Sequence, residues 1–499
     1  MHPRSITILG GGTAGWMAAC LFQHHWPDCR IGLIESSRIG IVGVGEGSTP
    51  QLKAFFKRIG VDEAEWMPDA HATYKVGIAF EGWDDDRDAY YFHPFPSDLD
   101  LHTRRDLYLA AHLRRTGRDV PAHPDRFLLP GRLAASRRGP GHADDWPFEV
   151  SYGYHFDAHE VGQVLKRVAT VRGVEWIDTE IASVDVMGGD VAALVGTDGT
   201  RHEADFFVDA SGFRAMIVED ALKGDHRSYA DRLFNDAAVV MPTPVAGEGP
   251  ECATRAVAME AGWRWSIPLT HRTGNGYVYS TRYASPEAAE AELRDALAVG
   301  DEVEARHLKF RTGRLAESWR GNALAIGLAQ GFLEPLEATA LHLVIASLEG
   351  FVAVVERDGL GEDARRTFNE DIAARYDGIR DYIHAHYRCQ KRRDTAYWRD
   401  CAATDDLSDD LKAVMTAWFT GQDVTAEISA RGMDRYYNAV SWHCLLAGYG
   451  NFPDDGRLRE PGVNDPTIDM DRIERFLDAC ETHYRPHNDM LAALEKGAR

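Results

Sequence analysis

Residues 6–15 have the sequence Ile-Thr-Ile-Leu-Gly-Gly-Gly-Thr-Ala-Gly, a short β-branched and apolar run followed at once by a glycine-rich turn. Residues 16–22 then have the pattern of a helix start. A strand, a glycine turn and a helix N-terminus together form an anion site, because the glycines let backbone approach a pyrophosphate and the helix amides face its charge. A second predicted strand, residues 31–34, ends in Glu35, which is placed to hold an adenosine ribose. The pattern predicts a bound dinucleotide, held by Gly10, Gly12, Thr13, Ala14, Gly15 and Glu35.

The amino-acid composition and net charge argue against several classes of protein. The chain has 499 residues, 44% of them hydrophobic, and a formal net charge of −23, which repels nucleic acids and anionic membranes. Its seven cysteines are scattered and contain no C-x-x-C spacing, which favours a reducing compartment and argues against a zinc or iron–sulfur site. No stretch approaches the roughly twenty apolar residues of a membrane helix. We therefore expect a soluble, cytoplasmic protein with no nucleic-acid or membrane partner.

The order of the predicted elements indicates an α/β protein. We expect a Rossmann-like dinucleotide-binding module over residues 1–350, with β-rich substrate segments inserted at about 80–150 and 215–310. Residues 351–499 are expected to form a mainly helical cap, intertwined with the first module. Helical patterns cover 341–357, 363–392, 407–417 and, more loosely, 469–495, and a further helix is expected to open at Tyr154 and run through Leu165.

Four further stretches carry unusual residue combinations. The segment 42–50 contains three glycines in five residues, so its backbone can lie against a flat ligand. Residues 72–80 alternate like a strand and place one lysine, Lys75, among apolar neighbours. Residues 263–268 read Trp-Arg-Trp-Ser-Ile-Pro, with both tryptophans on one strand face, and residues 332–340 follow an apolar run with Phe-Leu-Glu-Pro-Leu-Glu-Ala-Thr-Ala.

Taken in this order, the stretches resemble the flavin-dependent halogenases of the tryptophan-halogenase family. The resemblance runs from residue 5 to about residue 450, and its most specific part is the double-tryptophan hexapeptide together with Lys75 and Glu337. It implies a FAD cofactor, supplied as FADH2 by a separate flavin reductase, and chloride or bromide as cosubstrate. The cofactor loops implied beyond the first turn comprise Val44, Gly45, Glu46, Gly327 and Leu328.

The resemblance also implies roles around the reaction. Lys75 and Glu337 align with the catalytic lysine and glutamate. Thr339 and Ala340 align with the pair whose backbone amides hold the halide, where the family usually has glycine or serine at the second position; alanine is acceptable there unless the turn needs a positive φ. The residues aligned with those that keep substrate away from the flavin are Trp263, Trp265 and Pro268, and those aligned with substrate-lining residues are His93 and Phe95.

The implied chemistry delivers hypohalous acid to an electron-rich ring. A lysine in an apolar environment can donate hydrogen bonds to that oxidant or, once neutral, accept the halogen as a haloamine. We favour hydrogen bonding by the cation, paired electrostatically with Glu337. The Glu337 carboxylate would then take the proton that leaves the ring after the halogen adds.

The chain departs from the family pattern at residues 431–443. Gly432 aligns where an acid would bind the ammonium of free tryptophan, and the aromatic walls become Tyr436 and Tyr437, with Trp442 nearby. A site that has lost these polar contacts discriminates against its former ligand. We therefore expect an indole-type or other electron-rich aromatic substrate without the amino-acid backbone.

Two other functions remain open from the sequence. A flavin-dependent aromatic hydroxylase usually carries a late Gly-Asp turn, whereas residues 326–329 here are Ile-Gly-Leu-Ala. A non-catalytic flavin-binding protein would have no need for Lys75 and Glu337 together. The pair His384 and His386 is a poor joint metal site, since positions i and i+2 of a helix point to different sides, so no metal is expected. The resemblance also suggests a homodimer.

Overall fold

The dinucleotide sequence pattern lies at the centre of a mostly parallel sheet. The computed structural model describes residues 2–40, 46–245, 247–463 and 465–497. The sheet has the order β21 (Trp319–Arg320), β22 (Ala323–Ala325), β13 (Phe206–Asp209), β1 (Ser5–Leu9), β2 (Arg30–Glu35) and β9 (Glu175–Asp178). Only the pairing of β21 is antiparallel. Every residue of β1 is buried, as expected for a parallel strand covered on both faces.

One helix packs against β1 and β2 of this sheet and contacts two further helices. The first is α1 (Thr13–His25), and the other two are α6 (Ala158–Val171) and α8 (Ala340–Asp358). The apolar residues 16–22 predicted as a helix start are all buried in α1. The predicted α/β class is confirmed.

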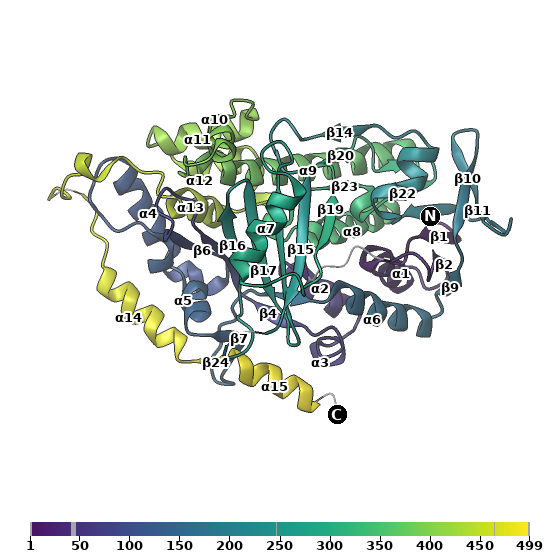
Figure 1. Ribbon diagram of the computed structural model, residues 1–499, viewed down its shortest axis with the longest axis horizontal. Coiled ribbons are helices and arrows are strands. Elements are labelled where there is room, and N and C mark those ends of the chain that lie inside the picture. The colour runs from purple at the N-terminus through teal and green to yellow at the C-terminus, as the bar shows by residue number, and fades with distance from the viewer. Residues whose placement is uncertain (1, 41–45, 246, 464, 498–499) are drawn as a thin grey trace.

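A second, larger sheet occupies the middle of the molecule (Figure 1). Its seven strands have the order β19 (Arg306–Lys309), β15 (Ala237–Thr243), β18 (Thr273–Tyr279), β17 (Gly262–Pro268), β16 (Thr254–Met259), β5 (Gly77–Glu81) and β6 (Tyr90–Pro94). All pairings are antiparallel except that of β16 with β5. This sheet carries the double-tryptophan motif on β17 and His93 on β6.

A small sheet of β3 (Glu46–Gly47), β8 (Gly153–Phe156) and β4 (Thr73–Lys75) holds the lysine. The expectation of a helix opening at Tyr154 is wrong, because residues 153–156 form β8, which pairs with β4. The helix α6 begins only after Asp157, whose side chain accepts hydrogen bonds from the amides of His159 and Glu160. The aromatic, β-favouring residues before this N-cap belong to the strand.

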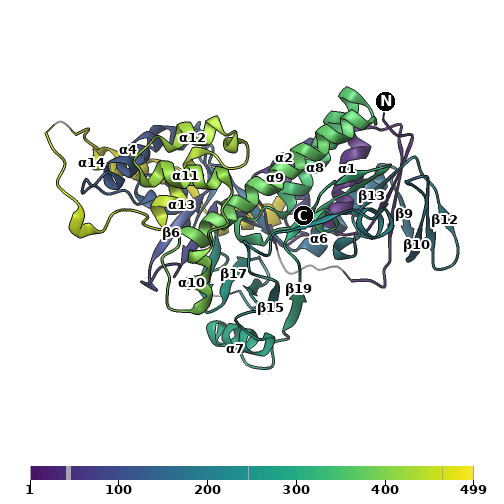
Figure 2. The same ribbon diagram turned by 90° about the horizontal axis from the view of Figure 1, so that it is seen from above.

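Helices dominate the chain after residue 340. Figure 2 shows the long helix α9 (Glu362–Cys389) running from the side of the parallel sheet to the helical end of the molecule. That end contains α11 (Asp409–Phe419), α12 (Val424–Ala430) and α13 (Ala439–Gly448), whereas α10 (Ala396–Ala403) lies beside β17. Of the helical stretches predicted from the sequence, 341–357, 363–392 and 407–417 correspond closely to α8, α9 and α11.

The last predicted helical stretch, 469–495, is interrupted. It consists of α14 (Met470–Glu481), the short strand β24 (Tyr484–Pro486) and α15 (His487–Gly497). Pro486 cannot continue a helix, and β24 pairs instead with β7 (Arg138–His142). At the start of α15, the Nε2 atom of His487 accepts a hydrogen bond from the Tyr74 amide at 3.2 Å. The C-terminal segment thus contacts β4, the strand that carries Lys75.

The remaining elements surround these sheets. They include α2 (Gln51–Arg58), α3 (Glu63–Trp66), α4 (Arg104–Arg115), α5 (Leu129–Ala135), α7 (Pro286–Leu297), β10 (Ile181–Met187), β11 (Asp190–Gly196), β12 (Arg201–His202), β14 (His226–Ser228), β20 (Gly313–Leu315) and β23 (Gly331–Phe332). Within the described residues, no helix combines the length and apolar character needed to cross a bilayer.

Candidate functional site

The first glycine turn has the geometry of a phosphate cradle. Gly10 adopts φ +117°, and a β-carbon there would collide with the carbonyl oxygen of Ala210. Gly12 precedes α1 without a side-chain cap, and a β-carbon at Gly12 would meet no atom within 4 Å. The amides at the start of α1 therefore border free space, which suits a pyrophosphate.

A second turn meets the first. Gly327, with φ +59°, follows β22 and precedes Leu328, and a β-carbon at Gly327 would lie 3.0 Å from that of Ala14. Thr13 uses its hydroxyl to donate a 3.0 Å hydrogen bond to the Ala158 carbonyl, so the proton of this hydroxyl is not free to bind an anion. The structure thus brings these two predicted cofactor segments together, with Gly15 packed tightly behind Gly10.

Glu35 ends β2 as predicted but already has a partner. Its Oε1 atom lies 2.7 Å from Nζ of Lys166, which also stands 3.5 Å from the ring centroid of Trp176. A ribose would share this carboxylate with Lys166. Of the glycine loop, Val44 and Gly45 lie outside the described residues, whereas Glu46 pairs with β8, and burial, aided by nearby Asp157, raises its pKa to about 7.

Lys75 is completely buried and lacks a partner. Within the described part of the chain, its Nζ atom makes no hydrogen bond, and it stands 5.4 Å from the ring centroid of Phe95. A β-carbon at Gly47 would lie 3.2 Å from this Nζ, so the absence of a side chain there leaves room for the amine. Burial lowers the pKa of Lys75 to about 7, and the negative charge of Glu337 opposes this shift.

Glu337 is a buried carboxyl group near Lys75. It ends the 3₁₀ helix η6 (Pro335–Glu337) and is 4% exposed. Its Oε1 atom lies 2.8 Å from Nε2 of His386. Burial raises the pKa of Glu337, and the nearby His93 and Lys75 lower it in part. Lys75 and Glu337 therefore act electrostatically on each other inside the same buried region.

Aromatic side chains lie near both groups: Phe95 beside Lys75, and Tyr382 and Tyr437 near Glu337. The Tyr382 ring stacks on that of Tyr437 at 3.6 Å and 7°, and meets the edge of Trp442 at 4.8 Å. Its hydroxyl lies 3.4 Å from Nε2 of His93 and donates to the carbonyl of Ser441 at 2.9 Å. We call the following side chains the Lys75 cluster: Lys75, His93, Phe95, Glu337, Tyr382, His386, Tyr437 and Trp442.

Two members of this cluster were missed from the sequence. Tyr382 and His386 are spaced i, i+4 on α9, so they share a face of that helix. In the sequence, His386 stands out only as the neighbour of His384, in a pair poorly spaced for a joint metal site. Burial lowers the pKa of His386 to about 3, so this imidazole is neutral beside Glu337. Within the described residues, no group of three or more His, Cys, Asp or Glu side chains is arranged to hold a metal ion.

Tyr436 lies away from the cluster. Its ring packs on Gly378 and lies 5.8 and 5.4 Å from the guanidinium carbons of Arg375 and Arg435. Because Tyr437 faces Tyr382, the neighbouring Tyr436 points to a different side of the chain. Of the two predicted tyrosine walls, the structure therefore brings only Tyr437 to Glu337.

The two tryptophans of β17 stand together, with ring centroids 6.1 Å apart. The indole nitrogen of Trp263 donates to Oε2 of Glu334 at 2.9 Å. Glu334 is fully buried and also accepts hydrogen bonds from Asn235 at 2.8 Å and Tyr387 at 2.5 Å, which no sequence pattern indicated. At the end of the hexapeptide, the Pro268 carbonyl accepts a 2.7 Å hydrogen bond from Thr73, two residues before Lys75.

The predicted halide turn lies where α8 begins. Thr339 is buried, with no hydrogen-bond partner for its hydroxyl within the described residues, while Ala340 is the exposed first residue of the helix. The residue with positive φ is Ala338, at +55°, and not Ala340. Alanine at position 340 is therefore free of backbone strain, and the N-terminal amides of a 19-residue helix are oriented to favour an anion.

Comparisons with known proteins show which proteins this chain resembles. The family model described as tryptophan halogenase matches residues 5–459. A 7-chloro-L-tryptophan 6-halogenase of Kutzneria sp. (strain 744) is 36% identical over 474 residues, covering 89% of this chain and 90% of its own. A tryptophan 7-halogenase of Lentzea aerocolonigenes is 32% identical over 504 residues, covering 94% and 93%. A solved flavin-dependent halogenase from Xanthomonas campestris superposes with a TM-score of 0.85 at 33% identity, covering 99% of each chain.

Proposed function

From the premise that this chain belongs to the flavin-dependent tryptophan halogenase family, we propose that it uses O2 and chloride or bromide to halogenate an electron-rich, indole-type ring. The observation that carries the proposal is the Lys75 cluster. A buried amine and a buried carboxyl act on each other there, among aromatic side chains that suit a flat ring.

The two glycine turns fit a flavin dinucleotide. The open space at Gly12 and the meeting of Gly327 with Ala14 would accommodate the pyrophosphate and the neighbouring part of the cofactor. When bound, reduced FAD supplies, with O2 and a halide, the chemistry that forms hypohalous acid. The amides at the start of α8, beside Thr339 and Ala340, would hold the halide.

Lys75 would act on the oxidant. Its ammonium form donates a hydrogen bond to the oxygen of hypohalous acid, which polarises the oxygen–halogen bond. As a ring carbon attacks the halogen, that bond breaks, and the departing hydroxide takes a proton from Lys75 to give water. A pKa of about 7 suits this proton donation near neutral pH.

Glu337 would act on the ring. Once the carbon–halogen bond has formed, the ring cation must lose a proton to become aromatic again, and the Glu337 carboxylate can accept it. The neutral His386, 2.8 Å from Oε1, lies against one oxygen of this carboxylate. The tryptophan pair on β17, with Trp263 fixed by Glu334, would keep the ring away from the flavin.

The segment after residue 430 supports a substrate other than free tryptophan. Gly432 has φ +65°, a conformation that favours glycine, so an acid at this position would be strained. The side chain that approaches its carbonyl oxygen is the cation Arg435, whose Nε donates at 2.9 Å. Position 432 therefore offers no carboxylate to an ammonium group.

The test is an assay of the full chain with FAD, a flavin reductase, NADH, bromide and either indole or free tryptophan, read by product mass. We expect brominated indole, recognised by the bromine isotope doublet, and a much lower yield from tryptophan. Lys75→Ala should abolish the product without weakening FAD binding, and Lys57→Ala on the exposed face of α2 should change neither. An oxygen adduct in place of bromine would instead identify a hydroxylase, and undiminished turnover by Lys75→Ala would remove that residue from the mechanism.

A further inference from the structure

The strand that carries Lys75 has an unusual outer edge. Since the Lys75 amine has no hydrogen-bond partner within the described residues, its place depends on the backbone of β4 and on the packing around it. β4 is three residues long and lies at the edge of the small sheet. Tyr74 is opposite Tyr154 of β8, but the amide and carbonyl of Tyr154 bond to Ser48 on the far side of β8. This antiparallel pair is therefore not hydrogen-bonded, and the amide of Tyr74 faces outward.

On this outer edge, β4 continues the parallel pairing of the larger sheet. In that sheet β5 pairs in parallel with β16. Just before these two strands, the amide of Val76 donates to the carbonyl of Cys252 at 2.8 Å. Two residues further back, the same register would bring the amide of Tyr74 to the carbonyl of Pro250. Lys75 therefore lies between the last direct bond of this ladder and the place where the next bond would form.

The imidazole of His487 occupies that place. The residue is 1% exposed, its Nε2 atom accepts from the Tyr74 amide at 3.2 Å, and its Nδ1 atom lies 3.0 Å from the Pro250 carbonyl. Because a carbonyl can only accept, Nδ1 carries the ring proton and donates it. Burial lowers the pKa of His487 to about 4, so the ring is neutral and Nε2 stays an acceptor. The ring thus acts as a spacer that satisfies both backbone groups.

The helix that carries His487 is itself fixed to the rest of the molecule. The strand directly before it, β24, pairs with β7. The amide of His487 donates to the Arg137 carbonyl at 2.9 Å. Met490 packs against Gly139 and Gly141 of β7, where a β-carbon would collide with its thioether. This whole segment lies beyond residue 459, where the match to the family model ends.

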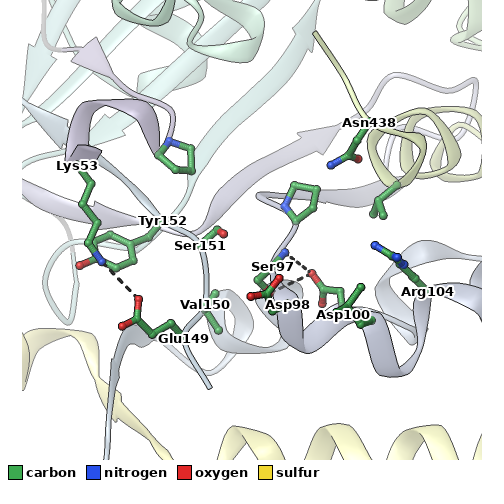
Figure 3. A pocket seen from close by; sticks show the side chains of 14 residues that line it. Lys53, Ser97, Asp98, Asp100, Arg104, Glu149, Val150, Ser151, Tyr152 and Asn438 are labelled. Carbon is green, nitrogen blue, oxygen red and sulfur yellow. Dashed lines mark hydrogen bonds and ion pairs between the residues drawn. The ribbon is translucent and has the colours of Figure 1, made fainter. Parts of the chain in front are cut away.

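The side chain of Tyr74 is held separately from its amide. Its hydroxyl donates to Oε2 of Glu63 at 2.9 Å, and the hydroxyl of Tyr152 donates to Oε1 of the same carboxylate at 2.7 Å. Tyr152 lines an open pocket of about 410 Å³, where Lys53 stands 4.1 Å from its ring centroid (Figure 3). Neighbouring side chains of a strand point to opposite faces, so Lys75 leaves β4 on the face away from these tyrosines. A shift of the Tyr74 backbone would therefore move Lys75 within its cluster.

We propose that His487 is a positioning residue, whose imidazole sets the separation between β4 and the segment 250–252 and thereby directs the amine of Lys75. The proposal rests on the halogenase function above, in which Lys75 binds hypohalous acid before the ring is modified. A displaced amine would no longer hold this oxidant, which would then escape to solvent. His487 is not a member of the Lys75 cluster, so its effect reaches the reaction through β4.

The experiment measures brominated indole and escaped oxidant for each FADH2 consumed by the full chain. Parallel reactions without indole contain monochlorodimedone, a soluble halogen acceptor that traps oxidant leaving the protein. We expect His487→Ala to lower kcat for indole about 10- to 100-fold, because a misplacement of about 1 Å can cost a factor of about 100. Escaped oxidant should rise relative to product, with little change in FAD affinity or in KM for indole. A merely destabilised protein would lose both in the same proportion.

Two further substitutions separate the contacts of the ring. His487→Gln can place an oxygen near the position of Nε2 and should restore most of the activity. His487→Asn can replace only Nδ1 and should behave like His487→Ala. Asn488→Ala is the matched control, because the exposed Asn488 lies on the same helix and donates to the Glu248 carbonyl at 2.5 Å rather than to β4. It should behave as wild type.

Several results would overturn the proposal while leaving halogenation by the wild type intact. They are wild-type kcat in His487→Ala, product and escaped oxidant that fall together, or equal activity of the Gln and Asn variants. If His487→Ala does not fold, the Gln and Asn variants decide the question, with thermal unfolding midpoints as the check on their stability. A wild type that halogenates neither indole nor the trap would instead contradict the proposed function.

Discussion

The turn at residues 10–15 is made within one stretch of chain, whereas the Lys75 cluster collects its side chains from β4, β6, η6, α9 and α13 and from the residues that flank β6 and α13. In the turn, a positive φ and close backbone contacts demand glycine at particular positions. In the cluster, the side chains come from separate elements and approach one another only after folding. The cofactor end therefore has a strong local signature in the sequence, and the substrate end depends on tertiary packing.

The largest effect we expect is on the glycine turn at residues 10–15, which is formed within one stretch of chain. Gly10→Val should abolish FAD binding, because its side chain would strike the Ala210 carbonyl at a φ of +117°. FAD affinity measured by flavin fluorescence is the check. Gly456→Ala, where a β-carbon meets nothing within 4 Å, is the control and should bind FAD normally. Normal FAD affinity in Gly10→Val would show that this turn is not the cradle.

The second effect is on the Lys75 cluster, whose side chains come from several elements. Glu337→Gln should lower kcat for halogenation by about 10²–10⁴, the usual contribution of a positioned general base, because the amide cannot accept the ring proton. Steady-state rates with saturating substrate measure it, with FAD affinity as the check that the first region is unaffected. An unchanged kcat would mean that another group takes the proton.

The third effect concerns Glu334, which fixes the side chain of Trp263, one of the two tryptophans that we propose to keep the ring away from the flavin. Glu334→Ala removes the acceptor of Trp263, Asn235 and Tyr387, which leaves three buried donors unpaired. We expect the free energy of unfolding to fall by about 2–4 kcal/mol, measured by urea denaturation. Glu334→Gln keeps an oxygen for these donors and should lose much less. Equal stability of the two variants would contradict the anchoring role.

The fourth effect is a pH dependence with opposite signs for activity and stability. If the ammonium form of Lys75 acts, kcat should fall about tenfold per pH unit above a pKa of about 7. Stability should rise over the interval from about 7 to the ordinary lysine value of 10.5, because the unfolded chain binds the proton that the folded chain has lost.

Rate profiles and urea midpoints between pH 6 and 10 would measure both trends. Lys75→Met should lack the rise in stability, which provides the matched control. A kcat that increases above pH 7 would instead favour the neutral amine and a haloamine route.

The family, the α/β class and the long helices α8 and α9 were predictable from the sequence and are confirmed. Local sequence patterns gave wrong secondary structure where pairing with distant strands determines the conformation. Residues 154–156 became a strand because β4 and β3 pair with them, and the helical pattern of 469–495 is broken at Pro486 by pairing with β7.

At the candidate site, the roles assigned to Lys75, Glu337 and their neighbours stay predictions, although the structure brings most of these residues together. Tyr382 and His386 could have been found from their i, i+4 spacing on one long helix. Glu334 could not, because nothing in the sequence distinguishes it from the neighbouring glutamate. The outward position of Tyr436 follows from the turn at 433–435, which no periodicity indicates.

The central claim is that the Lys75 amine and the Glu337 carboxyl act on each other in one buried site. Its most direct test is the pKa of Lys75, measured by NMR with ¹³Cε-labelled lysine in the wild type and in Glu337→Gln. We predict that Lys75 titrates near 7 in the wild type and at a lower pH in the variant, because the carboxylate that favours the ammonium form is gone. The same pKa in both proteins, or an ordinary lysine value in the wild type, would contradict the account.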